Sequence, residues 1–126
     1  TAISAHYDDT CKKAGLNCHA SVADELTDVP PEVALGIFRV AQEALTNVLR
    51  HAKAKNVYLD LVCDDENYLL TIRDDGVGLG AVRKAGSHGL AGMRHRVKAL
   101  RGLISIDGVA GQGTTLVAKI PRAPAR

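Results

Sequence analysis

The sequence predicts an α+β fold, a two-layer α/β sandwich in which about three helices cover a mixed, mostly antiparallel sheet. Helical periodicity occurs in three stretches, residues 3–14, 32–52 and 90–100. A pair of strand-like segments, joined by a short turn, follows each of the last two stretches. The chain has 126 residues, of which 46% are apolar, which is enough for one domain with a single core.

A helix and a strand are expected first. Apolar residues spaced by three and four positions predict a helix over residues 3–14, and Gly15 provides a stop. Apolar and polar residues then alternate over residues 16–22, which is typical of a half-buried strand.

The second helix is the longest that the sequence predicts. Pro30, Pro31 and Glu32 form its entry, because proline fixes a helical φ where the first turn needs no donor, and a carboxylate suits the positive helix end. Over residues 32–52 one arc of the helix is apolar: Ala34, Ile37, Ala41, Ala44, Leu45, Val48 and Ala52. The opposite arc carries Arg39, Glu43, Thr46, Asn47, Arg50 and His51, with Val40 as an apolar exception.

Two hairpins are predicted in the rest of the chain. Residues 55–62 and 68–73 are expected to form antiparallel strands joined by the polar turn 64–67. A second pair of strands, 103–106 and 114–120, flanks a glycine-containing turn.

The third helix lies between the hairpins. It follows the glycine-rich stretch 76–89, has apolar positions at helical spacing over residues 90–100, and is closed by Gly102. After the last strand, the tail 121–126 is expected to fray.

Composition argues against several classes of protein. The formal net charge is +2, from 16 basic and 14 acidic residues that are interspersed, so no nucleic-acid partner is indicated. A basic cluster over residues 94–101 has no aromatic side chains to stack on bases, and we interpret it as a solvated or phosphate-facing surface. No apolar run approaches the roughly 20 residues of a membrane helix, which predicts a soluble, cytoplasmic domain and leaves open a membrane anchor elsewhere in the parent protein.

The cysteines and the chain start are also informative. Cys11, Cys18 and Cys63 contain no CxxC pair and leave an odd thiol. We therefore expect neither a metal site nor a disulfide framework, only small buried or partly exposed side chains. The chain begins at Thr1 without a methionine, which suggests a piece of a longer protein.

Glu43 and Asn47 are four positions apart in the long helix and so share one face, with Arg50 and His51 a turn further along. A carboxylate can orient or deprotonate an attacking group, a carboxamide oxygen suits Mg²⁺, and arginine pairs with phosphate oxygens. Phosphoryl transfer uses all three. The alternative is an ordinary solvated face, which most surface helices have.

The stretch Asp74-Asp75-Gly76-Val77-Gly78 follows a predicted strand, so the chain turns there. Its glycines allow the backbone to approach a planar ligand or to adopt a positive φ. The Asp74 carboxylate would accept a hydrogen bond from the exocyclic amine of adenine, whereas guanine presents a carbonyl oxygen at that place. The alternative is an Asp-Gly turn, to which Asp75 would belong.

Two common phosphate-binding motifs are missing from the sequence. There is no GxxxxGK[ST] motif, which excludes a P-loop, and Gly76, Gly78 and Gly80 have the wrong spacing for GxGxxG. The loop 80–88 instead runs into a helix that begins near Gly89, whose backbone N–H groups are suited to bind phosphates.

Four segments, in this order, resemble the ATP-binding motifs of bacterial sensor histidine kinases. Residues 38–52, which contain Glu43 and Asn47, resemble the N box. Residues 74–78 resemble the G1 box, residues 88–93 the G2 box, and residues 111–115 the glycine-threonine segment before the last strand. The resemblance covers essentially the whole chain and is strongest to the nitrate-type and desaturase-type sensor kinases, which have a short ATP lid.

The resemblance implies the Bergerat fold of the GHKL ATPases, in which ATP lies between helices and a mixed sheet. It implies that Asn47 coordinates Mg²⁺, that Glu43 is the catalytic residue that activates the phosphoacceptor, and that Asp74 binds adenine above Thr115. The ATP-binding residues that it implies are Asn47, Arg50, His51, Asp74, Gly76, Gly78, His88, Gly89, Leu90, Gly92, Met93 and Thr115.

The resemblance also implies partners. Residues 1–126 would form a single catalytic domain that donates the γ-phosphate of ATP to a histidine on a separate dimerisation domain, missing here. His6 is not expected to be that acceptor, because Tyr7 follows it where the family has an acidic residue. The full kinase would signal to a response regulator, and the isolated domain would be a monomer. Two alternatives remain open, a protein serine kinase of the anti-sigma type and a non-catalytic ATP-sensing module.

Overall fold

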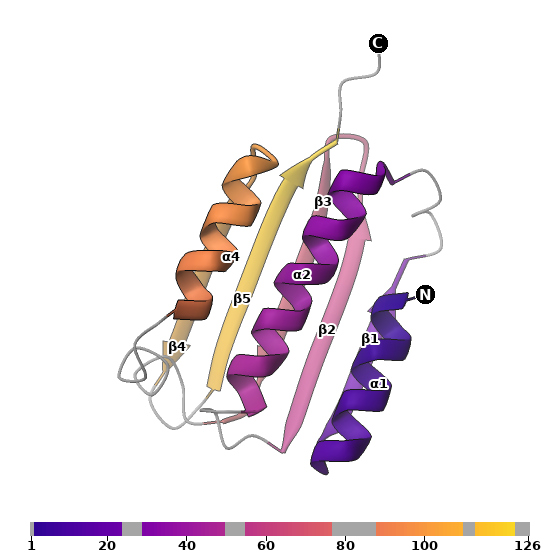
Figure 1. Ribbon diagram of the computed structural model, residues 1–126, viewed down its shortest axis with the longest axis vertical. Coiled ribbons are helices and arrows are strands. Elements are labelled where there is room, and N and C mark those ends of the chain that lie inside the picture. The colour runs from indigo at the N-terminus through magenta and orange to yellow at the C-terminus, as the bar shows by residue number, and fades with distance from the viewer. Residues whose placement is uncertain (1, 24–28, 50–54, 77–87, 110–112, 123–126) are drawn as a thin grey trace.

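The computed structural model describes residues 2–23, 29–49, 55–76, 88–109 and 113–122 (Figure 1). The elements follow in the order α1 (Ala2–Ala14), β1 (Asn17–Val22), α2 (Pro31–Asn47), β2 (Asn56–Cys63), β3 (Asn67–Asp74), α4 (His88–Ala99), β4 (Leu103–Val109) and β5 (Gly113–Pro121). The strands form one sheet in the order β1-β2-β3-β5-β4. The predicted α+β sandwich and both predicted hairpins are confirmed.

The sheet is mixed. β1 pairs with β2 in parallel, and every other neighbouring pair of described strands is antiparallel. The parallel pair requires a crossover, which α2 supplies between β1 and β2. α1, α2 and α4 lie side by side on one face of the sheet (Figure 1). Within the described part of the chain, no helix has the length and apolar character needed to cross a bilayer.

The core lies between the helix layer and the inner face of the sheet. Because side chains alternate along a strand, Val57, Leu59 and Leu61 of β2 are buried while the residues between them are not. Tyr7 of α1 is fully buried, and its hydroxyl donates a hydrogen bond to the carbonyl of Ala41 in α2 at 3.1 Å. Burial strongly raises the pKa of Tyr7, so this hydroxyl remains a donor that ties the two helices together.

Two positions of α2 differ from the predicted arcs. Val40, expected on the polar side, is only 1% exposed, and Ala34, expected on the apolar side, is exposed. Val40 is buried because α4 packs against that side of α2, where a Cβ added at Gly36 would collide with the side chain of Leu100. Ala34 lies in the first turn, at the end of the helix layer, where a side chain has fewer neighbours.

The helix that begins at Pro31 continues to Leu49, as predicted, but its hydrogen-bonding pattern changes near its end. Its α-helical hydrogen bonding stops at Asn47, and a π-helical turn follows at Val48 and Leu49. Such turns are frequent at functional sites. Residues 50–52, the last part of the predicted helix, lie outside the described residues.

α1 and α4 both end in a Schellman turn, but with different residues in the left-handed position. Gly15 follows α1 with φ of 75°, as predicted. After α4 the left-handed residue is Arg101, with φ of 63°, and not the predicted Gly102. Gly102 is needed for another reason, since a Cβ there would lie 2.6 Å from the carbonyl oxygen of Lys119 in β5.

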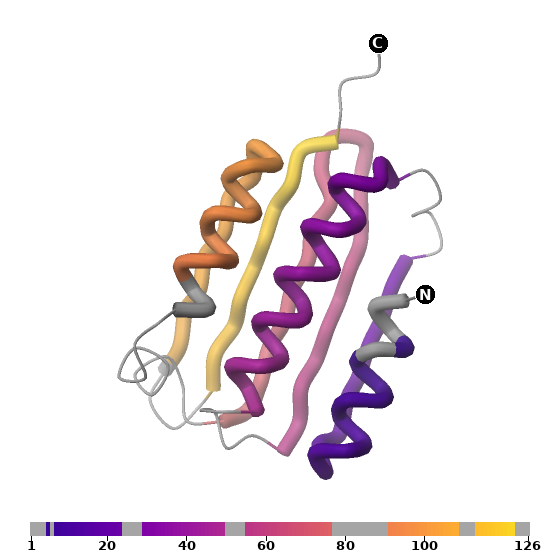
Figure 2. Tube along the Cα trace, in the orientation of Figure 1, coloured from indigo at the N-terminus to yellow at the C-terminus, as the bar shows by residue number. Residues whose placement is uncertain are grey.

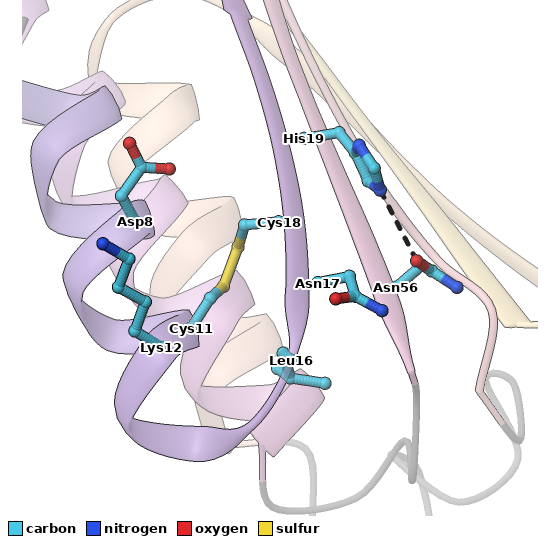
Figure 3. A pocket seen from close by; sticks show the side chains of 8 residues that line it. All are labelled: Asp8, Cys11, Lys12, Leu16, Asn17, Cys18, His19 and Asn56. Atoms are coloured by element: carbon cyan, nitrogen blue, oxygen red, sulfur yellow. Dashed lines mark hydrogen bonds between the residues drawn. A yellow bond between two sulfur atoms is a disulfide. The ribbon is translucent and has the colours of Figure 1, made fainter.

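A disulfide joins α1 to β1. It links Cys11 and Cys18, whose Cα atoms are 6.0 Å apart (Figure 3). The prediction of no disulfide is therefore wrong for this pair, and Cys63 is the free cysteine of the described residues. The spacing of the cysteines in the sequence did not indicate this disulfide, because the pairing depends on the turn at Gly15, which folds β1 back beside α1.

The predicted fraying of the tail is wrong for its first two residues. Pro121 ends β5, and the backbone N–H of Arg122 donates to the carbonyl of Glu66 at 2.8 Å. The Arg122 guanidinium also donates to the carbonyl of Asp64 at 2.7 Å, so the tip of the first hairpin holds the chain here. Residues 123–126 lie outside the described residues.

Candidate functional site

The predicted site residues that the structure describes gather at one end of the sandwich. Figure 2 shows the C-terminal end of α2, the end of β3 and the start of β5 at that same end, and Figure 1 shows the start of α4 there as well. These segments carry Asn47, Asp74, Thr114 and Gly92, respectively. Residues that are far apart in the sequence are thus neighbours because four elements begin or end together.

Asp74 ends β3 and is only 6% exposed. Its Oδ1 atom accepts a hydrogen bond from the backbone N–H of Gly76 at 2.8 Å. Burial raises the pKa of the Asp74 carboxyl, and hydrogen bonds from the backbones of Gly76 and Thr114 offset part of that rise. Among the described residues Asp74 is the only polar or charged residue that is buried, which marks it as a candidate binding group.

Asp75 lies in a different environment and forms the turn after β3. Its Oδ1 atom accepts hydrogen bonds from the backbone N–H groups of Lys55 at 2.8 Å and Asn56 at 2.9 Å. Its Oδ2 atom accepts another from the side-chain amide of Asn56 at 2.8 Å. The hydrogen bonds from Asn56 and Lys55 lower the pKa of Asp75 to about 2. Asp75 therefore closes the end of the β2–β3 hairpin, which agrees with its interpretation as a turn residue.

Gly113 and Thr114 bring the start of β5 against Asp74. Gly113 has φ of 98°, and a Cβ at this position would collide with the carbonyl oxygen of Asp74. The backbone N–H of Thr114 hydrogen-bonds to the Asp74 carboxyl group. The Thr114 hydroxyl oxygen is buried and has no hydrogen-bond partner among the described residues. A buried hydroxyl without a partner is costly, so this oxygen is a candidate ligand contact.

Thr115, predicted to lie beneath adenine, is placed elsewhere. In the sheet it pairs with Arg73 of β3 and Asp107 of β4, both of which are exposed. Because side chains alternate along a strand, Thr114 and Thr115 point to opposite faces of the sheet. The structure therefore brings Thr114, and not Thr115, next to Asp74. The motif contained two adjacent threonines, and only the strand register separates them.

Glu43 and Asn47 share one side of α2, as predicted, and Glu43 contacts α4. The Glu43 Oε1 atom is 3.4 Å from Nε of Arg96, whereas Oε2 is buried without a hydrogen-bond partner among the described residues. Gly92 lies against this carboxylate, since a Cβ added there would be 3.0 Å from Oε2. Asn47, one turn further, is half-buried.

The first turn of α4 offers backbone groups to the site. The helix starts at His88, and the leading N–H groups of a helix have no partner within the helix and attract anions. Met93 is only 1% exposed and belongs to the core, so it packs beneath the site. The backbone, but not the side chain, is described for His88, Gly89 and Leu90. Outside the described residues lie Arg50, His51 and Gly78.

The groups present at this end of the sandwich suit the adenine base of ATP. The buried carboxylate of Asp74 and the unpartnered hydroxyl of Thr114 can pair with the exocyclic amine and a ring nitrogen of adenine. The described residues contain no group of three or more His, Cys, Asp or Glu that could hold a metal ion. A Mg²⁺ ion would therefore depend on the amide oxygen of Asn47 and on phosphate oxygens of its nucleotide, as is usual for this ion.

A separate pocket of about 370 Å³ lies beside α1 and β1 (Figure 3). It is lined by Asp8, Cys11, Lys12, Leu16, Asn17, Cys18, His19 and Asn56. None of the predicted site residues lines this pocket. Asn56, which donates to Asp75, connects it to the turn after β3, so the pocket adjoins that turn but is formed by other groups.

Comparison with known proteins identifies related sequences and folds. The sequence model of the family described as "Histidine kinase-, DNA gyrase B-, and HSP90-like ATPase" matches residues 32–124. The chain is 38% identical over 93 residues to the signal transduction histidine-protein kinase/phosphatase DegS of Brevibacillus brevis, which covers 73% of this chain and 24% of that protein. It is 34% identical over 113 residues to the DegS protein of Bacillus subtilis, which covers 86% of this chain and 29% of that protein.

Solved structures share the fold. The histidine kinase domain from the Erythrobacter litoralis EL346 blue-light activated histidine kinase has a TM-score of 0.80, with 24% identity over 94% of this chain and 62% of that chain. At this identity the likeness shows the fold alone. The chain spans 24% and 29% of the lengths of the two curated relatives, so it corresponds to one part of those proteins.

Proposed function

The chain belongs to the histidine kinase-, DNA gyrase B- and HSP90-like ATPase family, as an ATPase domain of the histidine kinase type, and we propose that it binds Mg²⁺-ATP and phosphorylates a histidine. The acceptor histidine would lie on a separate dimerisation domain of a two-component sensor kinase. The observation that carries this proposal is the buried carboxylate of Asp74 beside the unpartnered hydroxyl of Thr114.

Asp74 and Thr114 would select adenine. The carboxylate would accept a hydrogen bond from the exocyclic amine of the base, and the hydroxyl would pair with a ring nitrogen. Guanine would place its carbonyl oxygen opposite the carboxylate, so two acceptors would face each other without a proton between them. Both protein groups are buried, which strengthens a matched contact and makes a mismatched one costly.

Glu43 and Asn47 would act on the phosphates. The amide oxygen of Asn47 would hold Mg²⁺, whose charge offsets that of the phosphate oxygens. Glu43 would accept the Nδ1 proton of the acceptor imidazole while Nε2 of that imidazole attacks the γ-phosphorus. The bond from the γ-phosphorus to the bridging oxygen breaks, and its electron pair leaves with ADP. Backbone N–H groups at the start of α4 would hold the phosphates in place.

The activity of the whole protein is part of the proposal. The two curated relatives are named as histidine kinases, and the chain spans only 24% and 29% of their lengths. The histidine-bearing domain and a downstream response regulator would therefore complete the pathway. The domain would act in the cytoplasm and be a monomer on its own. Its formal net charge of +2 gives no reason to expect a nucleic acid partner.

The test combines this chain with a separately prepared dimer of histidine-bearing helices, Mg²⁺, and ATP labelled on the γ-phosphate. Acid-labile label on the histidine of that dimer is the expected result. Label on a serine would favour the protein serine kinase. Binding of ATP with no transfer under any condition would favour the non-catalytic ATP-sensing module.

A further inference from the structure

The carboxylate of Glu43 is held from a neighbouring helix. Oε1 of Glu43 is 3.4 Å from Nε of Arg96, and the two side chains are 29% and 43% exposed. Arg96 lies on α4, which follows residues 77–87 in the chain, whereas Glu43 lies on α2. The contact therefore joins the helix that carries the proposed catalytic residue to a helix 53 residues away in the sequence.

A second residue of α4 contacts the same carboxylate. Gly92 is four positions before Arg96 and so lies on the same face of α4. A Cβ at Gly92 would be 3.0 Å from Oε2 and 3.5 Å from Oε1 of Glu43, so α4 leaves room for the carboxylate but no more. Oε2 is enclosed there without a hydrogen bond from the described residues. The two oxygens are thus held differently: Oε1 by a hydrogen-bond donor, and Oε2 by its close packing against Gly92.

This ion pair contributes little to stability. Both side chains are partly exposed, and pairs of that kind are weak because solvent screens them. The ion pair can nevertheless orient the Glu43 carboxylate, because Nε–H of an arginine is a directional hydrogen-bond donor. An acid or base that is misplaced by a fraction of an ångström loses much of its effect on rate.

We propose that Arg96 is a positioning residue for phosphoryl transfer, which orients the Glu43 carboxylate through Oε1 and sets it against Gly92. This inference rests on the proposed function, because it assigns to Arg96 a role that acts only through Glu43. It also links the carboxylate to the placement of α4, the helix whose first turn would hold the phosphates.

The first test compares transfer rates and ATP affinity in the assay with the histidine-bearing dimer. Arg96→Gln should lower the transfer rate at saturating ATP about tenfold, with the Kd for ATP changed by less than about twofold. Arg96→Lys keeps the charge but lacks the Nε donor, so it should recover only part of the rate. Arg39→Gln, an exposed arginine one turn before Glu43 on α2 that is not assigned to the site, is the matched control and should keep the wild-type rate. An Arg96→Gln chain with the wild-type rate, or with ATP affinity lost in parallel, overturns the proposal.

The second test asks whether Arg96 acts through Glu43. Glu43→Gln should lower the transfer rate, and adding Arg96→Gln to that variant should produce no further loss. An equal loss from Arg96→Gln in both backgrounds would show an independent role and overturn the proposal.

A third measurement separates this proposal from the proposed function. If the wild-type chain transfers no phosphate, the proposed function fails, and the contact can still be judged by NMR of the arginine Nε–H groups. Glu43→Gln should shift the Arg96 signal and leave that of Arg94 in place. An unshifted Arg96 signal means that the contact does not exist in solution, and the positioning role is then excluded.

Discussion

Asp74 and Asp75 are neighbours in the chain but contribute to stability with opposite signs. Burial raises the pKa of Asp74 in the folded protein, so ionising this carboxyl favours unfolding. Backbone and side-chain hydrogen bonds lower the pKa of Asp75 to about 2, so its ionised form favours folding. A buried carboxyl group whose charge destabilises the fold is typical of a binding site, which supports the assignment of Asp74 as the base-binding residue.

Asp74→Asn is expected to weaken ATP binding and to stabilise the protein without ligand. The asparagine amide either turns its NH₂ group towards the exocyclic amine of adenine, so that two donors face each other, or offers a neutral acceptor in place of a charged one. ATP binding, measured by calorimetry, should therefore weaken by about 1–3 kcal/mol. The raised pKa of Asp74 stabilises the folded protein at low pH, and this contribution is lost as the pH rises through the pKa that Asp74 has in the folded state. The melting temperature of Asp74→Asn should therefore exceed that of wild type at pH 7, and the difference should shrink below about pH 4. Unchanged ATP affinity would falsify the adenine assignment.

Thr114→Val and Thr115→Val are expected to differ. Thr114→Val removes a buried hydroxyl without a partner, so it should leave the stability of the ligand-free protein unchanged or raise it. It should weaken ATP binding by about 0.5–1.5 kcal/mol, measured by calorimetry, because one hydrogen bond to the nucleotide is lost. Thr115→Val, on the opposite face of the sheet, should bind ATP as wild type does. If Thr115→Val weakened ATP binding and Thr114→Val did not, the contact with adenine would be assigned to Thr115.

The helices and strands of this fold depend on how their ends are held. The turn at Gly15 folds β1 back along α1, and the disulfide between Cys11 and Cys18 fixes that corner. α1 packs mainly against β1, and the hydrogen bond from Tyr7 to Ala41 ties it to α2. The N-terminal helix should therefore be the element most sensitive to loss of the disulfide.

Reduction of the Cys11–Cys18 disulfide is expected to destabilise the protein by about 2–3 kcal/mol. The reason is that opening this short loop increases the conformational entropy of the unfolded chain. Urea unfolding of the wild-type chain should shift to lower concentration when a thiol reductant is added, and Cys18→Ser should show that loss without reductant. Cys63→Ser, the matched control, should keep the sensitivity to reductant because Cys63 is free. A wild-type chain indifferent to reductant would contradict the disulfide's role in stability.

The described helices all lie on one face of the sheet, and the β2–β3 hairpin lies at its centre. On the face opposite the described helices, the ring of Tyr58 stacks on His19 with centroids 4.7 Å apart and lies under the guanidinium of Arg73 at 4.5 Å. At its two ends the hairpin is held by carboxylates whose pKa values are lowered by hydrogen bonds. Asp64 accepts from the backbone of Asn67 and Glu66 at the tip, and Asp75 closes the other end.

The protein is expected to lose stability in acid because of these two carboxylates. A lowered folded pKa stabilises the protein above the unfolded value of about 4, and that contribution disappears as the pH falls towards about 2. Thermal unfolding followed from pH 7 to pH 2 should show a declining melting temperature. Asp75→Asn should melt below wild type at pH 7, and the two should converge near pH 2. A constant difference down to pH 2 would contradict the role of the Asp75 charge.

The local features of this protein could be predicted from the sequence. Helical and strand periods, the proline entry of α2, the turn at Gly15 and both hairpins depend on neighbouring residues, and all are found in the structure. The glycine and acidic motifs placed Asp74 at a strand end and put Glu43 and Asn47 on one helix face for the same reason. The α+β class followed from the order of these elements.

The contacts between distant segments were decided only by the tertiary structure. The burial of Val40, the disulfide of Cys11 with Cys18, the choice of Thr114 over Thr115, and the contact of Glu43 with Arg96 all depend on packing or register. Periodicity determines which face of an element a side chain occupies, but the partner of that face belongs to another part of the chain. The sequence therefore determined the elements and the chemistry that each carries, and the packing of α4 and β5 against α2 and β3 decided which groups meet in the site.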